Sequence, residues 1–235
     1  MEKFSVDQSL NPALYSAMVP DLILSQPEKG YRFSMDPFIL FNHIVNHIQL
    51  SGVCRVIDVG TGCGIIALLL ANKFPDLLIT GIEIQKELAQ FARQNVRKNR
   101  FEKQVNILCK DINHVTTDLS NGKADLLICN PPYKKKDTGR LNPDSQKAIA
   151  RHEISLNLDQ LFNCANRLLH KNGRISMIFP AERLHDLEQA MADHGFFAQS
   201  IQLVYTQKNS PGKRLILCAV KNNNQPCTFL PPVRI

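Results

Sequence analysis

The sequence lacks several features that mark particular classes of protein. It contains no run of about 18 apolar residues, the length that a membrane-spanning helix needs, so we expect no membrane association. It also shows no internal repeat and no low-complexity tract. The first residues, MEKFSVDQSL, lack the basic-then-apolar pattern of a secretory signal, so we expect a cytoplasmic location.

Closely spaced cysteine pairs are also absent. The chain has seven cysteines, an odd number, and none of them form a CxxC pair. Most lie in apolar runs, which predicts buried, reduced thiols and no metal site. They are Cys54, Cys63, Cys109, Cys129, Cys164, Cys218 and Cys227.

The composition suits a globular chain. The 235 residues are 44% hydrophobic, enough for one large domain or one and a half. We expect an N-terminal arm, hairpin and helix over residues 1–50, a main domain over 51–222, and a C-terminal tail over 223–235. The net charge of +7 suits a polyanionic partner without demonstrating one.

A glycine-rich turn is the strongest local signal. Residues 55–59 predict a buried strand, and the apolar residues 65–71 predict a helix. Between them lies Gly60-Thr61-Gly62-Cys63-Gly64. Glycines let the backbone approach a ligand, and the helix N-terminus faces it, so the pattern predicts a nucleotide-binding turn. A generic tight turn between strand and helix is the alternative.

The spacing of the glycines and the charge beside them limit which ligand this turn can bind. The G-x-G-x-x-G pattern of dinucleotide-binding enzymes is absent. Asp58 precedes the first glycine by two residues, and its carboxylate would repel a pyrophosphate. A cationic ligand, such as a sulfonium that carries a free amino group, fits this position better.

Two further strands are expected to end in acids. Residues 78–84 predict a strand with Glu83 at its end, placed to accept both hydroxyls of a ribose. Residues 105–109 predict the next strand, and Asp111 follows it. Asp111 is a candidate acceptor for the exocyclic amine of an adenine. A turn residue or helix N-cap is an equally good interpretation of Asp111.

A rigid elbow follows the fourth strand. The apolar run Leu126–Cys129 ends in Asn130-Pro131-Pro132-Tyr133. Two prolines remove two N–H donors, so no helix or ladder continues through them. Asn130 and the Pro131 carbonyl offer acceptors beside the flat ring of Tyr133, an arrangement that fits a planar ring with an NH₂ group. The alternative is a proline-terminated strand with Asn130 as a turn residue.

The segment after the elbow is basic. Residues 134–152 contain six lysines and arginines against two aspartates. A solvated lid is one interpretation, and contact with nucleic-acid phosphates is the one we favour. The candidate nucleic-acid-binding residues are Lys134, Lys135, Lys136, Arg140 and Arg151.

The remaining pattern completes an α/β chain. We expect a small hairpin from strands over 21–25 and 31–34, a helix after Ser34, helices over 85–98, 158–170 and 181–194, and strands over 174–179, 196–205 and 214–220. The last two strands should form an antiparallel hairpin. The order predicts a doubly wound, Rossmann-like sheet with a terminal hairpin.

Two motifs carry a resemblance to a known family. Asp58-Val59-Gly60-Thr61-Gly62-Cys63-Gly64 and Asn130-Pro131-Pro132-Tyr133 together resemble the class I S-adenosylmethionine-dependent methyltransferases that act on amino groups. Over about residues 20–220, including Phe33–Leu40 and Ala150–Glu153, the chain looks like the bacterial tRNA1(Val) adenine-37 N6-methyltransferases.

The resemblance implies a seven-stranded sheet whose last strand is antiparallel, S-adenosylmethionine as cofactor and tRNA as partner. It implies transfer at Asn130, Pro131, Pro132 and Tyr133. The cofactor contacts expected from motif and resemblance together are Asp36, Asp58, Gly60, Thr61, Gly62, Gly64, Glu83, Ile84, Asp111, Ile112 and Asn130.

Other functions remain open at this point. The elbow also suits a glutamine N5-methyltransferase of a release factor, although the basic segment argues against it. An N6-adenine methyltransferase of DNA or ribosomal RNA is a further alternative, as is a non-catalytic module that binds the cofactor and grips RNA. We favour a monomer, but the sequence does not reveal the oligomeric state.

Overall fold

The computed structural model describes residues 22–27, 35–50, 54–131, 157–205, 212–223 and 225–235. The chain divides into two compact units, Met1–Asp111 and Ile112–Ile235. Strands and helices alternate along most of the described part, which confirms the predicted α/β class.

The first unit is built on three parallel strands. β2 (Leu78–Glu83) lies in the middle and pairs in parallel with β1 (Arg55–Val59) and β3 (Val105–Cys109). Five of its six residues are buried, as expected for a central parallel strand. Parallel strands end at the same edge, so the residues that follow β1, β2 and β3 share that edge.

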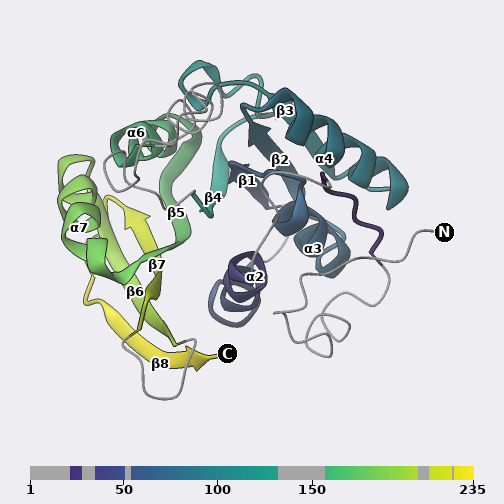
Figure 1. The fold of residues 1–235 in the computed structure, drawn as a ribbon. Helices are drawn as coiled ribbons and strands as arrows, with labels where there is room; N and C mark the ends of the chain where they lie inside the picture. Colours follow the sequence, from purple (N-terminus) through teal and green to yellow (C-terminus); the bar gives the residue numbers. More distant parts are fainter. Residues whose placement is uncertain (1–21, 28–34, 51–53, 132–156, 206–211, 224) are drawn as a thin grey trace, which may run out of the picture. The chain divides into compact units, whose positions relative to one another are not determined.

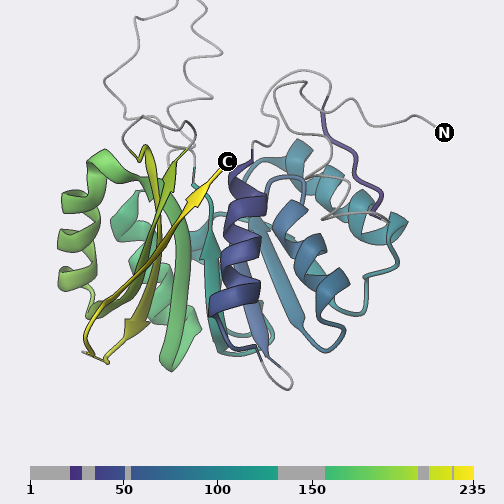
Figure 2. The same ribbon diagram turned by 90° about the horizontal axis from the view of Figure 1, so that it is seen from below.

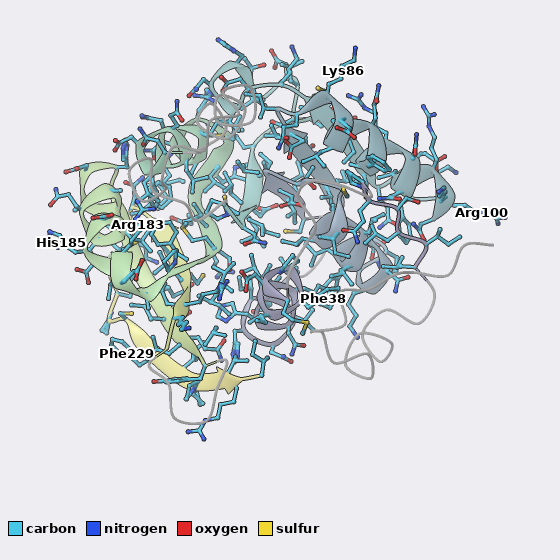
Figure 3. The ribbon with its side chains drawn as sticks, viewed as in Figure 1. Phe38, Lys86, Arg100, Arg183, His185 and Phe229 are labelled. Carbon is cyan, nitrogen blue, oxygen red and sulfur yellow. The ribbon has the colours of Figure 1, made fainter. Side chains whose placement is uncertain are left out.

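Two helices pack against these strands and against each other (Figure 1). α3 (Ile65–Lys73) is apolar all round, and its residues 65–71 are all buried. α4 (Lys86–Lys98) is amphipathic and keeps its charged face in water. Lys86 begins α4 and Arg100 follows its far end, and both are exposed (Figure 3).

The helix expected after Ser34 is α2 (Asp36–His47), which packs against α3. Ser34 itself lies outside the described residues. Met35 occupies the N-cap position, and Pro37 stands in the first turn, where its missing N–H costs nothing. Phe38 is among the largest fully buried side chains of the protein (Figure 3).

The strand predicted over residues 21–25 is wrong for the described residues 22–25. This segment is in no strand, and its backbone bonds to side chains of α4. Burial nevertheless alternates along this segment, because Leu22 and Leu24 are buried while Ile23 is exposed. An extended chain buries alternate side chains whether its partner is a strand or a helix.

The second unit holds five strands in the order β4-β5-β7-β6-β8 (Figures 1 and 2). β4 runs parallel to β5, and β7 is antiparallel to both β5 and β6. The strands are β4 (Ala124–Cys129), β5 (Leu169–Pro180), β6 (Phe196–Tyr205), β7 (Arg214–Lys221) and β8 (Thr228–Arg234). The predicted antiparallel pairing of the last two expected strands, now β6 and β7, is confirmed.

Two α-helices and two short 3-10 helices accompany these strands. α6 contacts both α7 and β5, and α7 packs on β6 (Figure 1). The helices are η1 (Ile112–His114), α6 (Leu158–Leu168), η2 (Ala181–Arg183) and α7 (Leu184–Asp193). Asn157 begins α6 with a capping box, accepting from Asp159 N at 2.6 Å.

The helix predicted over residues 158–170 ends two residues earlier, at Leu168. Gly173 does not cap it, because β5 runs through residues 171–173. Two lysines supply the cap instead. Lys123 donates to the Arg167 carbonyl and Lys221 Nζ to the Asn166 carbonyl at 2.8 Å, both in the last helical turn.

The described chain has eight strands, one more than the seven expected. The additional strand, β8, lies within the segment for which the sequence suggested only a tail, and it pairs in parallel with β6. The strand contains two prolines. β8 tolerates Pro231 and Pro232 because it is an edge strand, where unpaired N–H groups face solvent. Its Phe229 is 76% exposed (Figure 3).

None of the helices in the described ranges is long and apolar enough to cross a membrane. All seven cysteines are free thiols, and five of them are buried. Burial raises the pKa of the Cys63 thiol to about 12 and that of Cys218 to about 11. Neither thiol is therefore a thiolate at neutral pH.

Candidate functional site

The turn after β1 adopts a conformation that requires glycine. Gly60, Gly62 and Gly64 have φ values of 70°, 58° and 86°, a region that side chains disfavour. Gly64 is the N-cap of α3, so the turn opens the helix. A Cβ at Gly60 or Gly62 would meet no atom within 4 Å, and the backbone there is open to close approach by a ligand.

The N–H groups of this turn are largely used within the protein. Gly60 and Thr61 donate to the Ile82 carbonyl at 2.8 and 3.1 Å, and Gly64 donates to the Thr61 carbonyl at 2.9 Å. Gly62 donates to Glu83 at 2.9 Å. A phosphate-binding turn keeps such groups for its anion. This turn therefore does not suit a pyrophosphate, in agreement with the sequence spacing.

Asp58 lies beneath the turn. It is 1% exposed and accepts a hydrogen bond from Thr61 Oγ1 at 2.6 Å. Burial raises the pKa of Asp58 to about 6, and repulsion from Glu83 adds to the shift, while the hydrogen bonds from Thr61 and Ala67 oppose it. Asp58 thus braces the turn from inside, and its role as a ligand contact stays a prediction.

The shifted pKa of Asp58 predicts a pH-dependent stability. The folded state holds the proton up to about pH 6, whereas an ordinary aspartate releases it near 3.8. The free energy of unfolding should therefore fall as pH rises from about 4 to 6, by about 3 kcal/mol in total. Urea unfolding across this range should show the decline in the wild type.

Asp58→Asn should remove much of this decline, because an amide does not titrate and its oxygen still accepts from Thr61. Asp76→Asn, at an exposed aspartate of the same unit, is the matched control and should keep the wild-type slope. A slope unchanged by Asp58→Asn would show that another group carries the effect.

Gly81 was not predicted, yet it makes room for the turn. It pairs with Asp58 across the β1–β2 ladder. A Cβ there would lie 2.8 Å from Ile107 Cδ1 and 3.1 Å from Thr61 Oγ1. A larger residue would push Thr61 away from Asp58. A glycine inside an apolar strand was the available sequence signal, because it often marks close approach of another group.

Glu83 ends β2 beside the turn. Its Oε2 accepts from Gly62 N and its Oε1 from Gln85 N, each at 2.9 Å. Burial raises the pKa of Glu83, and the backbone bonds from Gln85, Gly62 and Ile84 oppose that shift. Each oxygen keeps a further lone pair, so the carboxylate can still accept from two adjacent hydroxyls.

The other predicted cofactor residues of the first unit occupy varied positions. Ile84 follows Glu83 and is 49% exposed, which leaves its side chain available as an apolar surface. Asp111 is half-buried and follows β3, whose end pairs with Glu83. Asp36 is buried in the first turn of α2. The structure thus brings Gly60, Thr61, Gly62 and Glu83 together around one turn.

The second unit contains the elbow and Ile112. Asn130 and Pro131 follow β4, whose last residue pairs with Met177 of β5, and Pro131 is buried. Ile112 is 8% exposed, and its carbonyl accepts from Arg167. Pro132 and Tyr133 lie outside the described residues, as do Lys134, Lys135, Lys136, Arg140 and Arg151. Their assignments stay predictions.

One residue of α4 contacts the turn and was missed. Asn95 is 0% exposed, and its Nδ2 donates to the Cys63 carbonyl at 2.9 Å. It lies three residues after Ala92, whose Cβ would be 3.4 Å from a Cβ at Gly64. A polar residue on the apolar face of a helix was the available sequence signal.

Comparison with known proteins identifies the class of the chain. Residues 50–222 match the family model described as "Methyltransferase domain". The chain therefore belongs to this methyltransferase family, as its resemblance predicted. The methyltransferase from Pyrococcus furiosus has the same fold, with a TM-score of 0.61 at 20% identity over 91% of this chain and 95% of that chain.

More particular similarity is to tRNA methyltransferases. The tRNA1(Val) (adenine(37)-N6)-methyltransferase of Porphyromonas gingivalis W83 is 36% identical over 162 residues, which are 68% of this chain and 63% of that relative. The protein of the same name from Phocaeicola vulgatus is 31% identical over 69% of this chain and 67% of its own length. This chain thus aligns with about two thirds of each relative.

Proposed function

We propose that the protein transfers a methyl group from S-adenosylmethionine to the N6 amine of an adenine in tRNA, at position 37 of a valine tRNA. The observation that carries the proposal is the similarity to curated tRNA1(Val) adenine-37 methyltransferases, in a chain that contains Asn130-Pro131-Pro132-Tyr133. The proposal places the reaction in the cytoplasm, where tRNA is available.

The residues of the first unit fit this cofactor. Glu83 has acceptor capacity for two ribose hydroxyls, and the open face at Gly60 and Gly62 admits a ligand close to the backbone. The turn has few free N–H groups, which suits a cofactor without phosphates. Asp111 is proposed to accept the adenine amine of the cofactor, and the exposed Ile84 side chain is proposed to pack on its ring. The carboxylates of Asp58 and Asp36 are proposed to attract the positively charged part of the cofactor.

The proposed chemistry is direct transfer between sulfur and nitrogen. S-adenosylmethionine supplies an electrophilic methyl group on a sulfonium. The adenine amine is a poor nucleophile because its lone pair is conjugated with the ring. Asn130 Oδ1 and the Pro131 carbonyl each accept a hydrogen bond from one N–H group of this amine. These bonds favour a pyramidal nitrogen with its lone pair directed at the methyl group.

Binding of the base completes the arrangement. Tyr133 stacks on the adenine, a contact worth about 1–3 kcal/mol. The C–S bond breaks as the N–C bond forms, and the amine then releases one proton to solvent. A base that is already unpaired in a tRNA loop needs less energy to enter the site.

Incubation with labelled S-adenosylmethionine and separate acceptors tests the proposal. The acceptors are total tRNA, ribosomes, DNA and release factor, followed by nucleoside analysis of any labelled nucleic acid. Label in tRNA as N6-methyladenosine is the expected result. Label in release factor alone would establish the glutamine methyltransferase instead, and label in ribosomes or DNA would replace tRNA as the substrate.

Loss of the lysines after the elbow should weaken RNA binding. Replacing Lys134, Lys135 and Lys136 together with Ala removes three cations that are proposed to contact phosphates. The slope of log K against log [salt] should become shallower by about two, because fewer counterions are released. Titration of labelled tRNA between low and moderate salt measures this slope.

A control for bulk charge is available on and just after α4. Lys86 and Arg97 of α4, with Lys103 shortly after it, are exposed cations of the first unit, and their replacement with Ala changes the net charge equally. We expect the salt slope of this variant to stay near the wild-type value. If both variants flatten the slope equally, the effect is one of net charge and the loop is not a specific contact.

A further inference from the structure

Asn95 of α4 and Asn99, the C-cap of that helix, hold the segment at residues 22–27 through the peptide groups of Ile23 and Ser25. Asn99 accepts from Ile23 N at 2.8 Å and donates to the Ile23 carbonyl at 2.7 Å. Asn95 forms the same pair of bonds with Ser25, each at 2.8 Å. Each side-chain amide thus satisfies one peptide N–H and one C=O, as a neighbouring strand would.

The spacing explains why a helix can do this. Asn95 and Asn99 are one turn apart, a rise of about 6 Å along the helix axis. Ile23 and Ser25 are two residues apart, about 6.6 Å in an extended chain. The match fixes the register, and Lys98 Nζ reinforces it by donating to Ser25 Oγ at 2.7 Å.

The two asparagines differ in one contact. The second N–H of Asn99 goes to the Asn95 carbonyl at 2.7 Å, within α4 itself. The second N–H of Asn95 goes to the Cys63 carbonyl in the glycine turn. Asn95 is therefore bonded to both the segment and the turn, whereas the side-chain bonds of Asn99 within the described residues go to the segment and to the Asn95 carbonyl.

The contact from Asn95 controls the orientation of one peptide group. The Cys63 carbonyl belongs to the same peptide plane as Gly64 N, which donates to the Thr61 carbonyl and opens α3. The preceding residue, Gly62, is held from the other side by Glu83. Loss of the Asn95 bond would leave a carbonyl without its partner and release one side of the turn.

We propose that Asn95 is a positioning residue for the cofactor, because it couples the turn at 60–64 to the segment at 22–27. The inference rests on the proposed function, since it requires S-adenosylmethionine to bind at this turn. A docked segment keeps Asn95 oriented toward Cys63, and a bound cofactor keeps the turn in the conformation that Asn95 contacts. Such coupling is reciprocal, so each event strengthens the other.

The test compares Asn95→Ala with Asn99→Ala, which is the matched control. Calorimetry with S-adenosylhomocysteine as probe measures the Kd of each. We expect Asn95→Ala to weaken binding by about 10-fold or more, and Asn99→Ala to stay within about threefold of wild type. Both variants remove two bonds to the segment, so a purely structural role would weaken binding equally in the two and would overturn the proposal.

Hydrogen exchange provides the reciprocal readout. In the wild type, S-adenosylhomocysteine should increase protection of the Ser25 amide, and Asn95→Ala should abolish that increase. Protection that does not respond to the probe in the wild type would contradict the coupling. If the wild type does not bind S-adenosylhomocysteine at all, the proposal that the protein uses S-adenosylmethionine is wrong.

A second variant keeps the test valid if Asn95→Ala does not fold. Ser25→Pro retains Asn95 and the Cys63 contact but removes the N–H that Asn95 accepts. We expect its Kd for S-adenosylhomocysteine to rise about 3- to 10-fold. A Kd equal to that of the wild type would show that the segment and the turn are independent.

Discussion

Replacing Asn130 with alanine should reduce methyl transfer by about 10³-fold, the loss expected when a polar group that orients the reacting atoms is removed. Alanine retains the fold of the β4 end but offers no acceptor for the amine. The proposed Pro131 carbonyl contact alone does not favour a pyramidal nitrogen. Single-turnover transfer to tRNA with saturating S-adenosylmethionine measures the loss.

The reaction step, and not cofactor binding, should carry the loss in Asn130→Ala. The Kd for S-adenosylhomocysteine should stay within about threefold of wild type. Asn46→Ala is a suitable control, because Asn46 is exposed on α2 and its side chain donates to the Asn42 carbonyl of the same helix. Transfer that survives in Asn130→Ala would rule out the elbow as the site of reaction.

Replacing Glu83 with glutamine should weaken cofactor binding by about 100-fold. One carboxylate oxygen accepts from Gly62 N and the other from Gln85 N, so both oxygens are needed. An amide keeps one oxygen and points an NH₂ group at the other N–H, so Gly62 or Gln85 loses its partner. The proposed contacts to the ribose hydroxyls are weakened together with the turn.

Calorimetry with S-adenosylhomocysteine tests this result, and Glu87→Gln is the control. Glu87 lies exposed in the first turn of α4, four residues from Glu83, and undergoes the same chemical change. Its Kd should match the wild type. If Glu83→Gln binds normally, the cofactor does not use this carboxylate, and the proposed site at the end of β2 is wrong.

Local signals in the sequence were sufficient to predict the glycine turn between β1 and α3. A buried strand, three glycines at alternate positions and an apolar helix occupy fewer than 20 consecutive residues, and each follows from backbone sterics. Glu83 was also found, because an acid at the end of an apolar strand is unusual. The parallel register of β1 and β2 then places Glu83 beside Gly62.

Contacts between distant residues were not predictable in the same way. Asn95 bonds to Ser25 and Cys63, which are 70 and 32 residues away in the sequence. An asparagine in a helix ordinarily indicates a solvent-facing or capping residue. β8 was missed for a related reason, since its pairing with β6 depends on an open edge that the proline-rich segment itself does not reveal.

The two asparagines that bond to residues 22–27 determine which substitutions this segment tolerates. They contact the peptide groups of Ile23 and Ser25, so the identity of the Ile23 side chain, which is 51% exposed, contributes nothing to these bonds. Substitution of Ile23 by another residue with an N–H should therefore leave these bonds intact, whereas loss of either asparagine amide should remove a pair of them.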